Sequence, residues 1–175
     1  GLIIHRRTSY PPPAHWWTFR AEDVAIATGI SSAADRVGSK PLLQASSGSQ
    51  PAYAATGING LPAADHDGIY SSMYTAAFTG ISEPYTVAVA FQLGALEGDR
   101  SGVVSDGSSG FEFGHNGSYW VVTADGGSTD ATSATGINTN PHFAVCRMRG
   151  DSSTEIRLDG SSIKTCDAGT NGISY

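Results

Sequence analysis

The histidine and cysteine side chains could bind a metal, but their spacing gives no support for a metal site. The sequence has no His-x-His, His-Glu-x-x-His or Cys-x-x-Cys pattern that would bring ligands together. It also has no Gly-x-Ser-x-Gly elbow and no phosphate-binding loop. We therefore expect no transition-metal site and no cofactor. The five histidines are isolated, at His5, His15, His66, His115 and His142.

Glu112, in Phe111-Glu112-Phe113, is the nearest approach to a catalytic carboxylate pair. Glycoside hydrolysis needs two carboxylates that face one bond. Glu112 has no partner acid beside it in the sequence, so we expect a solvent-facing strand residue. The chain is accordingly predicted not to be an enzyme.

Five residues around one turn are the best candidates for sugar binding. Such sites combine an exposed aromatic ring with a few polar side chains. Tyr119 and Trp120 occupy successive strand positions, so they point to opposite faces and at most one faces the core. That Trp120 is simply a core residue remains the alternative. The candidate set is Asp106, His115, Asn116, Tyr119 and Trp120.

The composition indicates a turn-rich β protein. Charged residues make up 15% of the 175 residues, 39% are hydrophobic, and there are 22 glycines. The net charge is −6 and no basic stripe is visible, so nucleic acid and anionic membranes are not expected as partners. No apolar run is long enough to insert in a bilayer.

The stretch 84–93 is the clearest predicted strand. Large apolar residues alternate with small or polar ones from Tyr85 to Leu93, which predicts one buried face. Pro84 stands at the start, where a missing N–H is tolerated. We expect this strand to be central in its sheet, with a second sheet covering its apolar face.

Asn-Gly and Asp-Gly pairs predict hairpins between the other short strands. Asn116-Gly117 should join strands at 111–113 and 119–123, and Asp159-Gly160 should join 154–158 to 162–166. A further strand is predicted at 142–149. The Thr/Ser/Gly-rich segment 126–140 reads as a loop or a weak edge strand.

The N-terminal half is predicted as a lead-in followed by short elements. Residues 1–14 contain three consecutive prolines, which favour an extended spacer. The predicted elements are a strand at 15–20, a helical turn at 21–28, a loop at 31–39, strands at 42–44, 52–54 and 63–66 around a turn at 58–62, and an irregular segment at 69–78.

Cys146 and Cys166 fall on the first and third strands of the predicted 142–166 meander. Such strands lie about 9–10 Å apart, whereas a disulfide needs Cα atoms within about 7 Å. We therefore expect free thiols.

An ordered set of short motifs resembles the LamG-like branch of the concanavalin A-like lectin/glucanase superfamily. The resemblance covers residues 16–166. Its motifs are Trp17 with Arg20-Ala21-Glu22-Asp23-Val24, Asp35-Arg36-Val37-Gly38, Gln44-Ala45, Gln50-Pro51-Ala52-Tyr53, Gly57-Ile58-Asn59-Gly60-Leu61-Pro62-Ala63, Asp67-Gly68, His142-Phe143-Ala144-Val145 and Arg157-Leu158-Asp159-Gly160.

The resemblance implies an all-β, two-sheet antiparallel jelly-roll sandwich over 15–175. Two features depart from the family pattern: His66 replaces the usual Phe, and Ile69-Tyr70-Ser71-Ser72 follows Asp67-Gly68 in place of a second Asp. The closing strands of the family are not visible before Tyr175. We therefore expect a longer chain or another subunit, such as a second copy, to complete the sheet.

The resemblance also implies a calcium site, since relatives bind calcium through loop oxygens. Asp125 and Asp130, in Ala-Asp-Gly-Gly-Ser-Thr-Asp, are the candidate ligands. The alternative is that both side chains cap their own turns.

Family members occur as phage fibre, tail and capsid-surface proteins, in adhesion proteins and as carbohydrate-binding modules. The leading expectation is a virion surface component that contacts other subunits and a cell-surface glycan. The alternative is a secreted, extracellular lectin-like module, and a glucanase or lyase ranks third.

Overall fold

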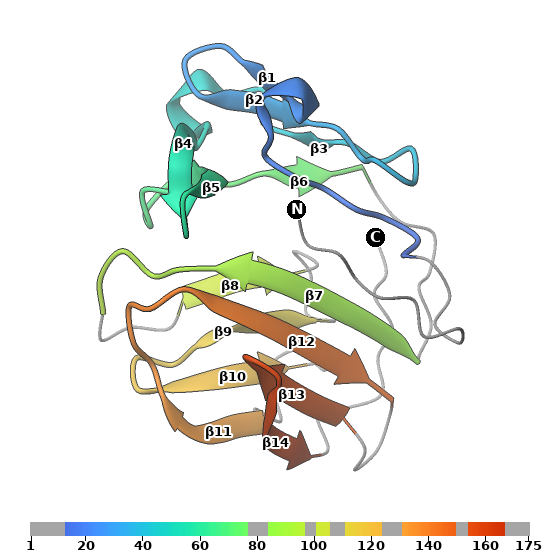
Figure 1. Cartoon of the computed structure of the whole chain (residues 1–175), viewed down its shortest axis with the longest axis vertical. Coiled ribbons are helices and arrows are strands. Elements are labelled where there is room, and N and C mark those ends of the chain that lie inside the picture. The colour runs from blue at the N-terminus through green and yellow to red at the C-terminus, as the bar shows by residue number, and fades with distance from the viewer. Residues whose placement is uncertain are drawn as a thin grey trace. The chain divides into compact units, whose positions relative to one another are not determined.

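The computed structural model describes residues 13–76, 84–96, 101–105, 111–123, 131–149 and 154–166. The elements in these ranges are antiparallel strands and two short 3-10 helices, so the all-β prediction is confirmed. The chain divides into two compact units, Gly1–Ala76 and Ala77–Tyr175, each described here by itself (Figure 1). The single domain expected over 15–175 stays a prediction, and the lead-in of residues 1–14 lies almost wholly outside the described residues.

The N-terminal unit is built from short strands. A four-stranded sheet has the order β1-β2-β3-β6, and β4 and β5 form a separate hairpin. The elements are η1 (Ala21–Asp23), β1 (Val24–Ile26), β2 (Ile30–Ala33), β3 (Leu42–Leu43), η2 (Ser47–Ser49), β4 (Ala52–Ile58), β5 (Leu61–Asp65) and β6 (Tyr74–Thr75).

Three predictions for this unit need correction. In the segment 15–20, a single bridge between Trp17 and Asp35 replaces the predicted strand. The helical turn at 21–28 is limited to η1, because the β-branched residues of β1 pair with β2 instead. The loop predicted at 31–39 begins as β2.

The β4–β5 hairpin follows from its Asn-Gly turn. Asn59 and Gly60 both have positive φ, 52° and 76°, as a type I′ turn requires. Ile58 pairs with Leu61 across this turn. The turn predicted at 58–62 is limited to Asn59-Gly60, because β4 continues to Ile58 and the strand predicted at 63–66 begins earlier, at Leu61.

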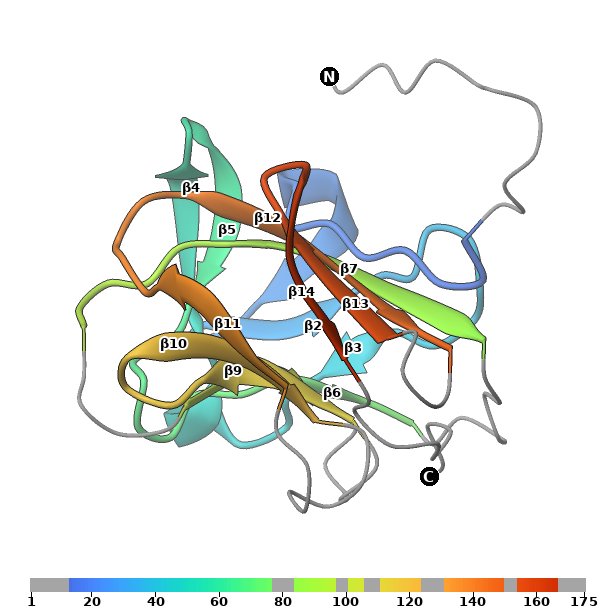
Figure 2. The ribbon, with the colours of Figure 1, turned by 90° about the horizontal axis from the view of Figure 1, so that it is seen from below.

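The C-terminal unit contains two four-stranded antiparallel sheets, with the orders β14-β13-β12-β7 and β11-β10-β9-β8. Strands β9–β11 and β12–β14 lie in two layers (Figure 2). The strands are β7 (Tyr85–Phe91), β8 (Ser101–Ser105), β9 (Glu112–His115), β10 (Tyr119–Thr123), β11 (Ala131–Gly136), β12 (His142–Met148), β13 (Thr154–Leu158) and β14 (Ser161–Cys166).

Strand β7 is the predicted amphipathic strand, but not in the predicted position. Its burial alternates as expected: Tyr85, Val87 and Val89 are half-buried, and the residues between them are exposed. The prediction of a central strand is wrong, since β7 pairs only with β12 among the described strands. A single buried face is compatible with an edge position, and strand length says nothing about the number of neighbours.

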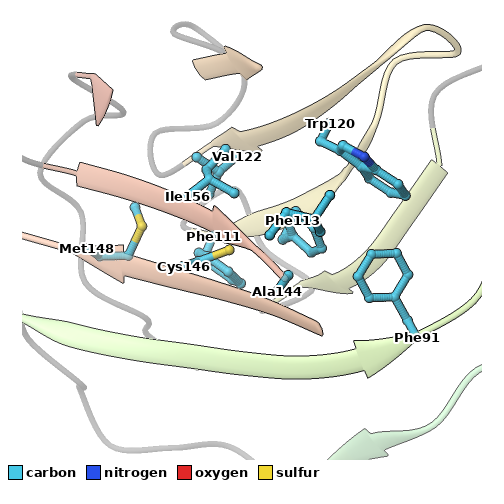
Figure 3. Packing of buried hydrophobic residues seen from close by; sticks show 10 residues of the cluster. Phe91, Phe111, Phe113, Trp120, Val122, Ala144, Cys146, Met148 and Ile156 are labelled. Carbon is cyan, nitrogen blue, oxygen red and sulfur yellow. The ribbon is translucent and has the colours of Figure 1, made fainter. Parts of the chain in front are cut away.

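Side chains from both sheets of the C-terminal unit meet between the layers (Figure 3). This gives the unit a sandwich-like core, as the apolar face of β7 predicted. The buried cluster consists of Phe91, Phe111, Phe113, Trp120, Val122, Ala144, Cys146, Met148, Ile156 and Leu158.

The strand placement of both cysteines is confirmed, since β13 separates β12 from β14. Cys146 is a free, buried thiol on β12, and burial raises its pKa to about 12. A thiol with so high a pKa is unreactive at neutral pH. The side chain of Cys166 lies outside the described residues.

Candidate functional site

The hairpin of β9 and β10 carries four of the five residues predicted for sugar binding. Asn116 Oδ1 accepts hydrogen bonds from the backbone N–H groups of Ser118 (3.2 Å) and Tyr119 (2.9 Å). Gly117 follows with φ of +86°. The Asn-Gly pair thus forms the predicted turn, and the Asn116 oxygen closes it.

Tyr119 and Trp120 face opposite sides of β10, as the alternation predicted. Tyr119 is 43% exposed, whereas Trp120 is fully buried. The Trp120 ring centroid lies 5.1 Å from that of Phe91 and 6.0 Å from that of Phe113 (Figure 3). As a sugar-binding candidate Trp120 is therefore corrected to a core residue, because a buried ring offers no face for a sugar to stack on.

His115 is also buried, at 2% exposure. Its ring packs edge-on against Trp120, with 6.2 Å between the two ring centroids. Its Nδ1 accepts a hydrogen bond from the N–H of Gly117 at 3.2 Å. His115 therefore supports the hairpin from inside. Exposed Asn116 and Tyr119 remain accessible on this hairpin, and Asp106 lies outside the described residues.

A histidine that the sequence did not single out forms the most organised polar cluster of the C-terminal unit. His142 Nδ1 lies 2.7 Å from Asp159 Oδ2, and His142 Nε2 lies 2.9 Å from Asn138 Oδ1. The side chain of His142 is 6% exposed, and its ring centroid lies 5.5 Å from that of Trp120. We call Asn138, His142 and Asp159 the His142 cluster.

Both ring nitrogens of His142 face oxygen acceptors. Asn138 Oδ1 also accepts the N–H of Asn140 at 2.8 Å, which fixes the orientation of the Asn138 amide. Asn138 Oδ1 therefore accepts a hydrogen bond from His142 Nε2, and His142 Nδ1 contacts the Asp159 carboxylate. Both ring nitrogens of His142 are therefore engaged by partners within the protein.

Asp159 joins the β13–β14 turn to β12. Its Oδ1 accepts the N–H of Phe143 at 2.9 Å, and its own N–H donates to the carbonyl of Phe143 at 2.9 Å. Burial alone would raise the pKa of Asp159, but the hydrogen bonds from Phe143 and His142 outweigh it and lower this pKa. The His142 cluster thus holds turns together.

A second His–Asp pair lies in the N-terminal unit. His15 Nδ1 lies 2.6 Å from Asp35 Oδ2, and the Asp35 side chain is 1% exposed. Burial raises the pKa of Asp35, but the bond from His15 and several backbone N–H groups hold it well below its usual range. The backbone N–H groups bound to this carboxylate belong to Trp16, Val37, Gly38 and Lys40.

This arrangement explains why the sequence reads Asp35-Arg36-Val37-Gly38. A Cβ at position 38 would lie 2.5 Å from both Asp35 Oδ2 and His15 Nδ1, so any larger residue would displace this pair. The Trp17 ring stacks on the His15 ring, with 5.7 Å between their centroids. Trp17 Nε1 donates a hydrogen bond of 2.7 Å to the carbonyl of Lys40. The carboxylate therefore organises a loop, as in the His142 cluster.

The turn after β5 displays two large apolar side chains. Asp67 Oδ1 accepts the backbone N–H groups of Ile69, Tyr70 and Ser71 at 2.8–2.9 Å. These hydrogen bonds lower the pKa of Asp67, the bond from Ser71 most of all. Ile69 is 74% exposed and Tyr70 is 75% exposed. The Asp67 turn is thus held from within and presents apolar groups outward.

The described residues contain no group of three or more His, Cys, Asp or Glu side chains that could hold a metal ion. The calcium candidates Asp125 and Asp130 lie outside these residues, so calcium binding stays a prediction. Within the same part of the chain, no helix has the length and apolar character needed to cross a bilayer.

No protein-family model, curated protein or solved structure matches this chain. The LamG-like resemblance therefore rests on the sequence motifs alone. The His142 cluster is the feature that sequence reasoning missed, because Asn138, His142 and Asp159 follow no recognised spacing. The Asp-Gly turn signal at Asp159 was visible, but its partner His142 was not.

Proposed function

We propose that this chain is a non-catalytic structural and adhesion module of the concanavalin A-like, jelly-roll type, carried on the surface of a virion. The observation behind the proposal is the exposure of large apolar side chains in the N-terminal unit. Eight of them are exposed among residues 13–76, whereas the buried hydrophobic residues there are Ile30, Ala33 and Ala63. The exposed residues are Trp16, Ile26, Val37, Leu43, Leu61, Ile69, Tyr70 and Tyr74.

Exposed apolar side chains favour assembly with other subunits, because covering apolar area releases about 25 cal/mol per Å². The hydrogen bonds within the two His–Asp pairs, His15–Asp35 and His142–Asp159, favour a non-catalytic role. The carboxylate oxygens of each aspartate accept hydrogen bonds from backbone N–H groups and contact a histidine. Both pairs organise loops. The expected partners are other virion subunits, including a second copy of the chain.

A secreted glycan-binding module is the second candidate. Exposed Tyr119 favours it, because aromatic faces stack on sugar rings and Asn116 stands beside this residue. Glycan arrays screened with and without calcium would test it. Binding that Tyr119→Ala abolishes and Tyr70→Ala leaves intact would support this module, and binding unaffected by Tyr119→Ala would remove the hairpin from consideration.

Sedimentation of the native particle that carries this chain tests the virion proposal. We expect the chain to travel with a very large assembly in a density gradient and to remain there after a high-salt wash. The wash removes proteins that adhere to the particle only through charge interactions, because salt screens surface charges. Recovery of the chain only as a small soluble species would overturn the proposal and leave the secreted module as the working hypothesis.

A further inference from the structure

We propose that β7 is an assembly edge, through which this chain pairs in antiparallel fashion with β7 of a second copy of itself. This inference rests on the proposed function and deepens it, since it names one surface and one partner for assembly.

Four strands lie at the ends of the two C-terminal sheets, as far as the described strands go: β7, β8, β11 and β14. A strand at the end of a sheet pairs along one side, and its other side can accept a further strand. Natural proteins protect such edges with bulges, charged side chains, proline or short length, because an unprotected edge pairs with other chains.

Three of these four edges are irregular. The register shifts between Gly102 and Val104 on β8, between Tyr119 and Val121 where β10 meets β11, and between Ile156 and Arg157 where β13 meets β14. The sequence of β14 also contains a lysine, Lys164. Irregular register bends an edge and prevents a long run of new hydrogen bonds.

Strand β7 has none of these protections. It pairs with β12 over seven consecutive residues, from Tyr85 opposite Met148 to Phe91 opposite His142, with no shift in register. Its sequence, Tyr-Thr-Val-Ala-Val-Ala-Phe, contains no charged residue, no glycine and no proline. The edge is therefore regular along its length and carries no charge that would repel another strand.

The side chains of β7 suit a second copy of β7. Val87 and Val89 face the core, whereas Thr86, Ala88 and Ala90 are exposed. These three are small and uncharged, so two antiparallel β7 strands bring neither bulk nor like charges together. A twofold axis through Ala88 sets Thr86 opposite the partner's Ala90, keeps both cores on one side of the joined sheet and closes the assembly as a dimer.

The contact is an edge rather than a broad face, so it is small. Interfaces below about 1,200 Å² are typically weak and transient. Such a contact is effective where many copies are held close together, because linked sites raise the effective concentration. An assembly edge of this type therefore fits a component of a multivalent particle.

A charge-swap experiment on the full chain tests the pairing. One variant carries Thr86→Lys, Ala88→Lys and Ala90→Lys, and the other carries glutamate at the same three positions. All six changes affect exposed side chains, so both variants retain the core. Sedimentation velocity over a wide concentration series should show the unchanged chain associating to a dimer as its concentration rises, and each variant alone as a monomer at every concentration. A mixture of the two should again give a dimer, with a one-to-one composition by native mass spectrometry.

A control variant with Ser118→Glu, Ser161→Glu and Thr165→Glu adds the same charge as the glutamate variant at exposed positions away from β7. It should still dimerise. An unchanged chain that stays monomeric at the highest concentration, dimers of the lysine variant alone, or a mixture that stays monomeric would overturn the inference. Failure here leaves the virion proposal standing if the chain sediments with a particle. Conversely, a β7 dimer from a chain that is absent from particles overturns only the virion proposal.

Discussion

Tyr119 and Trp120 are neighbours on β10, yet one is exposed and the other is buried. The first is 43% exposed and the second is fully buried among Phe91, Phe113 and His142. Alternation along β10 sends successive side chains to opposite faces, so their roles follow from register. Tyr119 is accessible to solvent, whereas Trp120 belongs to the core.

We expect Trp120→Ala to lower the unfolding free energy by about 3–5 kcal/mol, because it leaves a cavity in a packed core. Tyr119→Ala, the matched neighbour on the exposed face, should lower it by less than about 1 kcal/mol. Urea denaturation of the full chain, followed by circular dichroism, measures both. Equal effects for the two substitutions would contradict the assignment of Trp120 to the core.

The carboxylate of Asp159 predicts a dependence of stability on pH. Its pKa is lowered in the folded protein, because hydrogen bonds from Phe143 and His142 outweigh the effect of burial. The unfolded chain therefore binds the proton more readily, and the stabilisation is present above the unfolded pKa, about 3.9. It is lost as the pH falls through the lower folded value.

Asp159→Asn removes this titration. Unfolding midpoints of the two proteins, measured by urea denaturation from neutral pH down to about pH 2, should differ most above about pH 4. The difference should shrink as the solution becomes more acidic. A difference that stays constant across this range would show that the Asp159 carboxylate does not contribute through its ionised form.

At the scale of elements, the turns carry the strongest local constraints. The Asp159–Gly160 turn between β13 and β14 has positive φ at both residues, 51° and 85°. Positive φ at the two central residues matches the right-handed twist of the strands that the turn joins. The same geometry at Asn59 and Gly60 joins β4 to β5.

Gly160→Ala should therefore destabilise the C-terminal unit by about 1–2 kcal/mol, since a Cβ is strained at φ of +85°. Gly94→Ala is the control, because Gly94 has an ordinary φ and open space around its Cβ position. Its effect should stay within about 0.5 kcal/mol. Gly160→Asn should fall between the two, as asparagine tolerates positive φ. Thermal unfolding followed by circular dichroism ranks the three, and equal midpoints would contradict the turn assignment.

Turns and strand faces were predictable from the sequence because their causes are local. Asn116-Gly117 and Asp159-Gly160 each formed the predicted hairpin, and β7 buried the predicted face. The neighbours of β7 were not predictable, since pairing partners depend on the whole chain. Likewise, His142 meets Asp159 only because β12 and β13 pair in one register, and no spacing in the sequence encodes that register.

For the whole molecule, buried apolar side chains are distributed unequally between the two units. The main buried cluster belongs entirely to the C-terminal unit, with ten buried residues from both of its sheets. In the N-terminal unit, polar contacts such as those of Asp35 and Asp67 organise the loops around a few buried residues. Hydrogen bonds define conformation well, but each adds only about 0.5–1.5 kcal/mol net.

This inequality predicts how fragments of the chain behave. The fragment 77–175 should unfold cooperatively on its own, because it keeps the buried cluster intact. The fragment 1–76 should show no cooperative transition, since a short chain with few buried apolar residues cannot offset the entropy of folding. Near-ultraviolet circular dichroism and urea denaturation of both fragments measure this. A cooperative transition in 1–76, or its absence in 77–175, would contradict the prediction.

If 77–175 folds as expected, it carries the whole β7 edge, so its self-association can be measured without the N-terminal unit.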